Sequence, residues 1–414
     1  MFRAIGGNSF RMREKTGARI LYVGNGGQIK MYIKDNTVHQ GRQAGDERNG
    51  ICFSMKGAEE RGMNMEKIMD LLEVMNVRSM RNWMNIRTLL ASPTTLNEKE
   101  VALQKQWIAR LKQHGINKIV GMSQSNFWPE TTEIDDPLAV PRRDLGEGSL
   151  YMRFLEQYGQ AWVTLVSTFP EIGYWEVGNE TNSNSFLHPL DYSQNSSSTF
   201  TMEEKALITA DMAYTAAKAV HGVDPNAVVI FPAIAPINGF QSMADFLEKV
   251  YEVIEAGRCI GGTDPDAYFD AVAWHCYYFC SSFTPENWLE GNNSVYRVMA
   301  DHGDGDKKVF LTEFGFSDAG ELEKDRAHAE YYKEIYRLAR EEMPYLDSLY
   351  PFRTIEDETA AEWGGTIEIY YGLFRVFDTE HFGAKEKAKA ICEIYGGDLS
   401  ELDRYIGGNS VYPR

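Results

Sequence analysis

The chain alternates short apolar runs with longer amphipathic runs, and this alternation limits the fold more than any other feature of the sequence. Between residues 50 and 396 the alternation repeats eight times. Each short run has the length and composition of a β-strand, and each longer run has apolar residues at three- and four-residue steps, as in an amphipathic helix. The eight predicted strands are GICFSM (50–55), VRSMRNW (77–83), INKIVGMS (116–123), GYWEVGNE (173–180), AVVIFPAIA (227–235), DAVAWHCYY (270–278), KKVFLTEFG (307–315) and DSLYPFRTI (347–355).

The predicted strands indicate a closed parallel sheet. Several are apolar throughout, which is typical of strands that are buried on both faces. Eight strand–helix units in succession favour a closed barrel with an outer ring of helices over an open doubly wound sheet, which stays the alternative. No strand is followed by the GxGxxG pattern of a dinucleotide-binding fold. We therefore predict an α/β protein with a (β/α)8 TIM barrel over residues 50–414.

Two segments depart from the alternation. The segment RILYVGNGGQIKMYIKD (19–35) has two alternating runs around a Gly-rich turn, which predicts a β-hairpin. No linker of low-complexity composition follows it, so we expect residues 1–49 to form a short N-terminal β-hairpin extension packed on the barrel. Residues 181–200 are rich in Ser and Asn, and they predict a long loop after the fourth strand. Loops of this length are usually functional or disordered.

The composition disfavours several kinds of partner. The chain has 42 Lys and Arg against 60 Asp and Glu, a net charge of −18, whereas nucleic-acid binding depends on basic side chains that neutralise phosphates. No apolar run approaches the length of about 18 residues that a membrane-spanning helix needs. The basic opening lacks the apolar stretch of a secretory signal, and five cysteines, an odd and sparse set, fit a reducing compartment. We expect a cytoplasmic protein without nucleic-acid or membrane partners; nothing indicates its oligomeric state.

Two carboxylates stand at the ends of predicted strands. In a barrel of this kind the catalytic groups lie at the carboxyl ends of the strands. Glu180 ends the fourth strand and Glu313 ends the seventh, so both should lie on the same rim. Hydrolysis of a glycosidic bond needs such a pair, because one carboxylate attacks the anomeric carbon while the other protonates the leaving oxygen and later deprotonates water. A separation of roughly 5–5.5 Å would retain the configuration at that carbon.

The motifs around these carboxylates resemble a known group of enzymes. WEVGNE and LTEFG are similar to the strand-four and strand-seven signatures of the clan A glycoside hydrolases, which are retaining enzymes on a (β/α)8 barrel. The resemblance implies that Glu180 is the general acid/base and Glu313 the nucleophile. It also implies that Asn179 hydrogen-bonds the 2-hydroxyl of the sugar. His275 and Tyr277 match the His-x-Tyr of the clan, in which the tyrosine orients the nucleophile.

Two arginines near the second strand are further candidates for substrate binding. Arg78 resembles the strand-two arginine of the clan, whereas Arg81 lies closer to the end of the strand. Alternation places Arg78 and Met80 on one face and Arg81 on the other. Glu176 should lie on the same face as Glu180 but one layer deeper, where an unpaired carboxylate would be costly. We predict that Glu176 forms a buried ion pair, with Arg78 as the leading partner.

Three tryptophans are candidate platforms for sugar rings. Trp83 follows the second strand, Trp128 the third, and Trp363 lies in the loop after the eighth. Many clan members have a tryptophan at the end of strand eight, where this chain has LYPFRTIEDE. We expect Phe352 or Trp363 to take its place in the sugar pocket.

Other kinds of chemistry have weaker support. His275, Cys276 and Cys280 lack the second His/Cys cluster that would complete a four-ligand metal site, so we predict no metal and no cofactor. Lys56 is the only lysine near a predicted strand end, which disfavours a Schiff-base aldolase. The pair Gly364–Gly365 is interpreted as part of a loop rather than a phosphate site.

These observations together predict a retaining glycoside hydrolase that acts on an oligosaccharide or glycoside. Small imported substrates are favoured over polymers, because no secretion signal or extra binding module was identified. The long loop after Glu180 is expected to wall off the site and make the enzyme exo-acting. Two alternatives stay open: a catalytically dead barrel that binds carbohydrate, and a barrel lyase or isomerase that acts on a phosphorylated sugar. The sugar, the anomer and the linkage depend on loop geometry, which the sequence does not specify.

Overall fold

The computed structural model of the chain describes residues 14–15, 18–25, 28–33, 46–124, 136–193, 198–277 and 283–406. These residues fall into two compact units, Met1–Ala44 and Gly45–Arg414. The first unit contains the antiparallel strands β1 (Glu14–Lys15), β2 (Ala18–Asn25) and β3 (Gln28–Ile33). Strands β2 and β3 pair around residues 26–27 as the predicted hairpin. The packing of this hairpin on the barrel stays a prediction.

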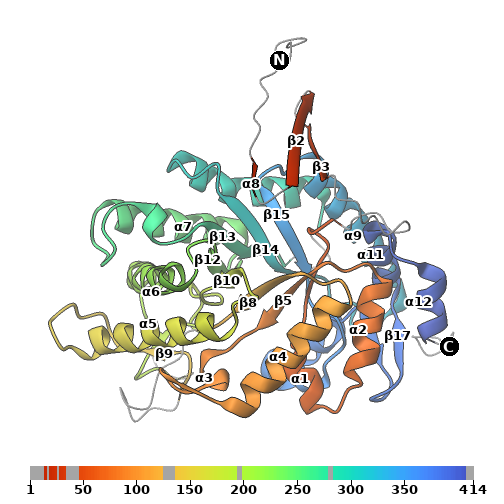
Figure 1. The fold of residues 1–414 in the computed structure, drawn as a ribbon, viewed down its shortest axis with the longest axis horizontal. Helices are drawn as coiled ribbons and strands as arrows, with labels where there is room; N and C mark the ends of the chain where they lie inside the picture. The colour runs from red at the N-terminus through yellow and green to blue at the C-terminus, as the bar shows by residue number, and fades with distance from the viewer. Residues whose placement is uncertain are drawn as a thin grey trace. The chain divides into compact units, whose positions relative to one another are not determined.

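The second unit is a (β/α)8 barrel, as predicted. Its eight-stranded sheet is parallel throughout and follows the order of the sequence. Parallel bridges join Asn49 to Leu349 and Cys52 to Phe352, so the first strand meets the last and the sheet closes (Figure 1). The open-sheet alternative is therefore wrong. The barrel strands are β4 (Gly50–Cys52), β5 (Ser79–Trp83), β8 (Lys118–Met122), β10 (Tyr174–Glu176), β12 (Val228–Ile234), β13 (Ala271–His275), β14 (Lys308–Phe314) and β15 (Leu346–Pro351).

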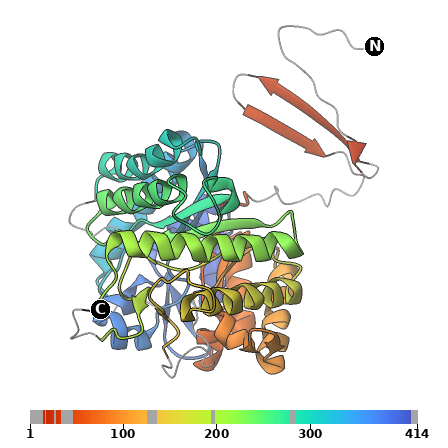
Figure 2. The same cartoon turned by 90° about the vertical axis from the view of Figure 1, so that its left-hand side faces the viewer.

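Helices form the outer ring of the barrel (Figure 1), and a view turned by 90° shows α5 and α6 side by side on its outside (Figure 2). The helices are α1 (Met55–Glu60), α2 (Met65–Val74), α3 (Ile86–Leu89), α4 (Glu98–Gln113), α5 (Leu150–Thr168), α6 (Met202–Val223), α7 (Phe240–Glu255), α8 (Pro285–Asp301), α9 (Leu322–Glu341), α10 (Ala361–Gly364), α11 (Glu386–Tyr395) and α12 (Leu399–Ile406). Among the described residues, no helix is both long and apolar enough to span a membrane.

Short elements complete the loops. They are the strand pairs β6 (Leu90–Ser92) with β7 (Thr95–Leu96), β9 (Ala139–Val140) with β11 (His188–Pro189), and β16 (Phe374–Val376) with β17 (Phe382–Ala384), together with 3-10 helices at Pro265–Ala267, Glu358–Ala360 and Thr366–Tyr371.

Local sequence signals set the ends of several helices. The side chain of Ser54 accepts a hydrogen bond from the backbone of Gly57 and so begins α1. For this reason the first barrel strand is shorter than the predicted run. Helix α6 begins with a reciprocal capping box between Thr201 and Glu204. Helix α11 ends at Gly396, whose left-handed backbone suits a residue without a Cβ atom.

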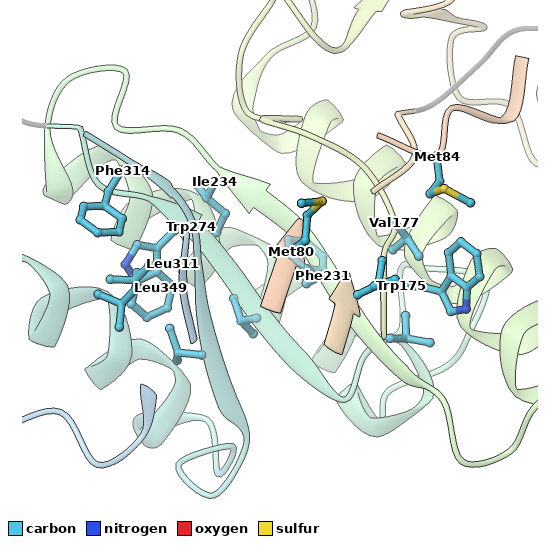
Figure 3. Packing of buried hydrophobic residues seen from close by; sticks show 14 of the residues in the cluster. Met80, Met84, Trp175, Val177, Phe231, Ile234, Trp274, Leu311, Phe314 and Leu349 are labelled. Atoms are coloured by element: carbon cyan, nitrogen blue, oxygen red, sulfur yellow. The ribbon is translucent and has the colours of Figure 1, made fainter. Parts of the chain in front are cut away.

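The core has an outer and an inner layer, and successive residues of a strand alternate between them. The outer layer lies between strands and helices and includes Met80, Trp175, Trp274 and Leu311 (Figure 3). Trp175, for example, packs edge-on against Trp162 of α5, with 5.9 Å between ring centroids. The inner layer is smaller and fills the barrel. Because large apolar residues occupy the outer layer, their neighbours along the strands point inward, and several of these are polar.

Candidate active site

A pocket of about 680 Å³ opens at the carboxyl ends of the strands. Its wall combines both predicted carboxylates with aromatic and polar side chains from the ends of several strands and from the following loops. Residues that line it and that the sequence had singled out are Trp83, Asn179, Glu180, Tyr277, Glu313 and Phe352. The strand ends therefore do converge on one cavity, as expected for this barrel.

Glu313 reaches the pocket through an irregularity in β14. Strict alternation would place Glu313 on the same face as Leu311, which packs in the outer layer. The pairing of β14 with β13 shifts register between Trp274 and His275, so that His275 lies opposite Glu313. An extra residue of this kind re-aims the following side chain. Thr312 and Glu313 consequently both reach the inner side of the barrel, where Thr312 donates to Glu176.

Glu313 is buried among three groups that favour its charged form. The Nη1 atom of Arg81 donates to Oε1 at 2.5 Å, the hydroxyl of Tyr277 donates to Oε2 at 2.6 Å, and Nδ1 of His275 lies 3.6 Å from Oε2. Burial alone would raise the pKa of Glu313, but the charges of His275 and Arg81 and the hydrogen bond from Tyr277 outweigh it. The pKa of this carboxyl is therefore lowered, and the group is ionised at neutral pH.

Glu180 reaches the pocket differently, because the backbone conformation after β10 positions it rather than a shift in strand pairing. Strand β10 ends at Glu176, and Gly178 (φ 147°) and Glu180 (φ 48°) both have positive φ. The backbone N–H of Glu180 donates to the carbonyl of Ala233 at 2.8 Å, which holds this turn against β12. The Glu180 side chain is more exposed than that of Glu313, 18% against 9%.

His275 lies between the two carboxylates. Its Nδ1 is 2.6 Å from Oε1 of Glu180. One ligand atom each of Glu180, His275 and Glu313 lie within 4.8 Å of one another. Burial alone would lower the pKa of His275, but the charge of Glu313 and the hydrogen bond with Glu180 raise it overall. The two carboxylates thus face one another across one small volume, as the sequence predicted.

Arg81, not Arg78, is the arginine of the site. The prediction of a buried ion pair for Glu176 is confirmed, but the predicted partner is wrong. Arg81 is fully buried and binds Glu176 through Nε at 2.6 Å and Nη2 at 2.9 Å. Arg78 lies before β5 on the same side as Met80, and it donates to the carbonyl of Gly115 at 3.4 Å and to the side chain of Asn76. Alternate residues of β5 point into the barrel, and Arg81 is one of them.

Asn179 and Tyr277 are held in place by this same charge network. The Nη2 atom of Arg81 donates to Oδ1 of Asn179 at 2.8 Å. Because that oxygen is engaged, the amide NH2 is the end of Asn179 that can donate to a hydroxyl in the pocket. Tyr277 donates to Glu313, as the resemblance implied, and burial together with the charge of Glu313 raises the pKa of its phenol.

By distance alone, Glu180, His275 and Glu313 could hold a cation. The guanidinium of Arg81 already binds Glu313 and would repel a second positive charge there. The set therefore fits a metal poorly, and the absence of a metal from the chemistry stays a prediction. Of the cysteines considered for such a site, Cys276 is buried and Cys280 lies outside the described residues.

The aromatic candidates divide into those in the pocket and those outside the described residues. Trp83 lines the pocket, and the Arg81 guanidinium lies 5.3 Å from the centroid of its ring. Phe352 also lines it, at the end of β15, with its ring 5.9 Å from that of Tyr277. Trp128 lies outside the described residues, and so does the side chain of Trp363, whose backbone belongs to α10.

Sequence reasoning missed several pocket residues that lie on long connections. Tyr371 lines the pocket and packs edge-on against Tyr277, with 5.5 Å between ring centroids. It lies at the end of a 3-10 helix far from the preceding strand, where no periodic pattern marks it. Phe186 lines the pocket from the predicted long loop, and the apolar pair before His188 was the available signal. Arg61 and Arg353 were also missed.

Comparison with known proteins bears on the fold. No protein-family model and no curated protein sequence matches the chain significantly. Among solved structures, a family 39 glycoside hydrolase from Bacteroides cellulosilyticus WH2 has a TM-score of 0.58 and 15% identity, covering 92% of this chain and 70% of that one. A GH5_18 variant from Bifidobacterium longum subsp. longum, in complex with Manβ1-4GlcNAc, has a TM-score of 0.57 and 13% identity, covering 84% and 78%.

A third match extends over nearly the whole of the solved structure that it matches. Xylanase 10B from Thermotoga maritima has a TM-score of 0.54 and 13% identity, covering 88% of this chain and 98% of that one. Likenesses at such low identity bear on the fold alone. In its fold the chain therefore matches the TIM barrels of the clan A glycoside hydrolases, the group that its strand-four and strand-seven motifs resemble.

Proposed function

We propose that this protein is a retaining glycoside hydrolase that cleaves an oligosaccharide or glycoside by double displacement. The observation that carries the proposal is the meeting of Glu180 and Glu313 in one pocket, with one oxygen of each within 4.8 Å. This upper limit on the distance between the two oxygens is compatible with the roughly 5–5.5 Å between carboxyl groups in retaining enzymes, and it is well short of the roughly 6.5–9.5 Å in inverting ones. Such a spacing favours direct attack by a carboxylate over attack by a water molecule held between the carboxylate and the sugar.

In the first step Glu313 attacks the anomeric carbon. A carboxylate oxygen of Glu313 forms a bond to that carbon as the glycosidic bond breaks, and the leaving oxygen takes the proton of Glu180. Arg81 and Tyr277 hold the attacking carboxylate in a single orientation. This orientation provides the near-attack geometry on which covalent catalysis depends. The NH2 group of Asn179 is placed to donate to the 2-hydroxyl, a contact that strengthens in the transition state.

In the second step water releases the sugar. Glu180, now a carboxylate, takes a proton from a water molecule as the water oxygen bonds to the anomeric carbon, and the bond to Glu313 breaks. Glu180 regains its proton and Glu313 its charge. The greater exposure of Glu180 supports this role, because its proton must exchange with leaving group and water. Buried Glu313 needs contact only with the sugar.

The test compares two variants on aryl glycosides of several sugars in both anomers. Glu313→Gln should be inert on every substrate, because no nucleophile remains. Glu180→Gln should still form the glycosyl-enzyme from substrates with good leaving groups, and added azide should restore its turnover and yield a glycosyl azide. Glu330→Gln, on an exposed position of α9, is the matched control and should keep full activity. If the wild-type protein cleaves no glycoside, or if Glu313→Gln stays active, the proposal is wrong.

The alternatives predict other outcomes of the same experiments. A dead carbohydrate-binding barrel would bind sugars without cleaving any member of the panel. A lyase or isomerase acting on a phosphorylated sugar would be protected by phosphate against thermal unfolding and inhibited by it. The presence of both carboxylates, one of them held ionised, supports the hydrolase over a dead barrel.

The glycine pair after the eighth strand, which was weighed as a phosphate site, has a structural role instead. Gly365 (φ 79°) ends α10.

A further inference from the structure

A second charged cluster lines the pocket, away from the carboxylates. Arg61 directly follows α1, and Arg353 follows β15; both line the pocket with side chains that are 20% and 13% exposed. Both reach the same carboxylate, Asp357, with Nη1 of Arg61 3.4 Å from Oδ1 and Nη1 of Arg353 2.9 Å from Oδ2. Neither arginine takes part in the proposed mechanism.

The cluster is held rigidly before any ligand binds. Arg61 donates through Nε to the carbonyl of Gly57 at 3.1 Å and through Nη1 to the carbonyl of Glu356 at 3.0 Å. The guanidinium of Arg353 lies over the ring of Phe352, 4.5 Å from its centroid. Backbone carbonyls and an aromatic face orient a guanidinium without neutralising its charge. Little side-chain entropy would therefore be lost on binding.

The cluster sets two guanidinium groups against one carboxylate of the pocket wall. Two guanidinium groups share Asp357, which also accepts hydrogen bonds from the backbone and hydroxyl of Thr359. Burial lowers the pKa of Arg61, the negative charges of Asp357 and Glu358 oppose this effect, and the charge of Arg353 adds to it. The pKa of Arg61 is lowered overall, chiefly because its guanidinium is buried.

Glu368 is a further acidic group on this side of the pocket, and the charge of Arg353 acts on it. It is half-buried and lines the same pocket. Burial raises its pKa, Arg353 opposes this, and the negative charges of Glu313 and Glu180 raise it further. Its net raised pKa favours the neutral form compared with an exposed glutamate. An anion that binds between the arginines would favour that neutral form further.

Arg353 is connected to the nucleophile through two aromatic side chains. The ring of Phe352, on which Arg353 stacks, is 5.9 Å from the ring of Tyr277, and Tyr277 donates to Glu313. One aromatic side chain therefore separates the cationic pair from the residues around the nucleophile. We expect the arginines to meet a substituent on the sugar bound at Glu313 or on the next sugar unit.

We propose that the pocket selects glycosides whose sugar carries an anionic substituent, a carboxylate, sulfate or phosphate group, bound by Arg61 and Arg353. This inference rests on the proposed glycosidase function and names its substrate class. The planar donor fork of arginine matches the paired oxygens of all three groups. The overall negative charge of the protein disfavours long polyanions, so the fitting substrate is a short glycoside with one such group.

The first test compares matched aryl glycosides that differ in one substituent: glucosides and galactosides, the corresponding uronides, the 6-sulfates and the 6-phosphates, each in both anomers. At least one anionic substrate should have a kcat/KM tenfold or more above that of its neutral partner. The substituent of the preferred substrate identifies the anion that the pocket binds. Arg61→Gln should lower that value about 10- to 100-fold, as expected for a lost charge-assisted contact, while the neutral partner changes less than twofold. Arg297→Gln, in an exposed ion pair on α8, is the matched control and should change neither.

A second test does not depend on turnover. Binding of glucuronic acid, galacturonic acid, glucose 6-sulfate, glucose 6-phosphate and glucose is measured by calorimetry on Glu313→Gln and on Glu313→Gln with Arg61→Gln. One anionic sugar should bind at least tenfold more tightly than glucose, and only in the protein that keeps Arg61. Cleavage of neutral glycosides alone would overturn the anionic specificity and leave the glycosidase proposal intact. Arg61-dependent binding of an anionic sugar without cleavage of any glycoside would overturn the glycosidase proposal and leave the anion-binding role of Arg61 intact. Equal binding of neutral and anionic sugars would overturn the inference in either case.

Discussion

Glu180 and Glu313 are the same chemical group in the same pocket, yet the fold treats them differently. Glu313 is brought inward by a register shift in β14 and is fixed by Arg81 and Tyr277. Glu180 follows a strand end with positive φ, has His275 as its close partner, and is the more exposed. The comparison teaches that barrel closure supplies proximity, while local irregularities and neighbours give each carboxylate its own electrostatic environment.

The largest effect expected within this comparison comes from removing Arg81, which binds Glu313 directly and has no hydrogen bond to Glu180 among those described. Arg81→Met leaves Glu176 and Glu313 buried without their countercharge, so we expect a loss of about 3–5 kcal/mol in the free energy of unfolding. Denaturant unfolding followed by circular dichroism measures it. The matched control is Arg78→Met, three residues earlier, which should cost no more than about 1 kcal/mol. Equal losses in the two variants would show that Arg81 is not the central charge of the site.

A sharper test of the same contrast removes one donor from Glu313 and leaves its position intact. Tyr277→Phe deletes the hydrogen bond to Oε2, so the pKa of Glu313 should rise toward its ordinary value of 4.5. Glu313 acts when ionised, and activity is lost as the pH falls through its pKa. The acidic limb of kcat/KM against pH should therefore move to higher pH in the variant, with a fall of about 10- to 100-fold at the optimum.

The pH profile of Tyr277→Phe has its own control. Tyr296→Phe removes a hydroxyl that donates to Gly305 beyond the end of α8, far from the pocket. The acidic limb of kcat/KM against pH should lie at the same pH in Tyr296→Phe as in the wild-type protein. An unchanged limb in Tyr277→Phe would mean that the tyrosine does not tune the nucleophile.

The smallest expected effect concerns the Glu180 side, where Phe186 of the long loop lines the pocket. We expect Phe186→Ala to widen the pocket and to raise the relative rate on longer oligosaccharides severalfold, because Phe186 lines it. Rates on a disaccharide and a tetrasaccharide with the same linkage measure the ratio. Leu145→Ala, at a position 46% exposed and outside the pocket lining, serves as control. A constant ratio in Phe186→Ala would contradict the expected exo-acting site.

Much of the fold follows from sequence periodicity, because a strand between helices needs an apolar run and a helix needs an amphipathic one. The pairing partner of Glu176 shows the limit of that approach. Which arginine faces inward depends on strand parity, and Arg78 lies one residue before the start of β5 whereas Arg81 lies within it. A resemblance favoured Arg78, which is the wrong residue. Parity alone would also have placed Glu313 outside, since a register shift leaves no mark in the pattern of apolar residues.

The loop residues of the pocket were beyond sequence reasoning for another reason. Arg61, Arg353 and Tyr371 meet only because the first and last strands of the barrel are neighbours. Their contacts join segments roughly three hundred residues apart, such as Arg61 with Asp357. No local pattern encodes such a contact, so the charge distribution of the pocket required the closed structure.

The most direct test of the central claim is to trap the intermediate on Glu313. A 2-deoxy-2-fluoro glycoside with a good leaving group, of whichever sugar the wild-type protein cleaves, slows the second step and lets the glycosyl-enzyme accumulate. Mass spectrometry of the intact protein and of its peptides should find one sugar on the peptide that contains Glu313, and none in Glu313→Gln. A label on another residue would contradict the assignment of Glu313 as the nucleophile, and cleavage that inverts the anomeric configuration without any label would contradict the double displacement itself.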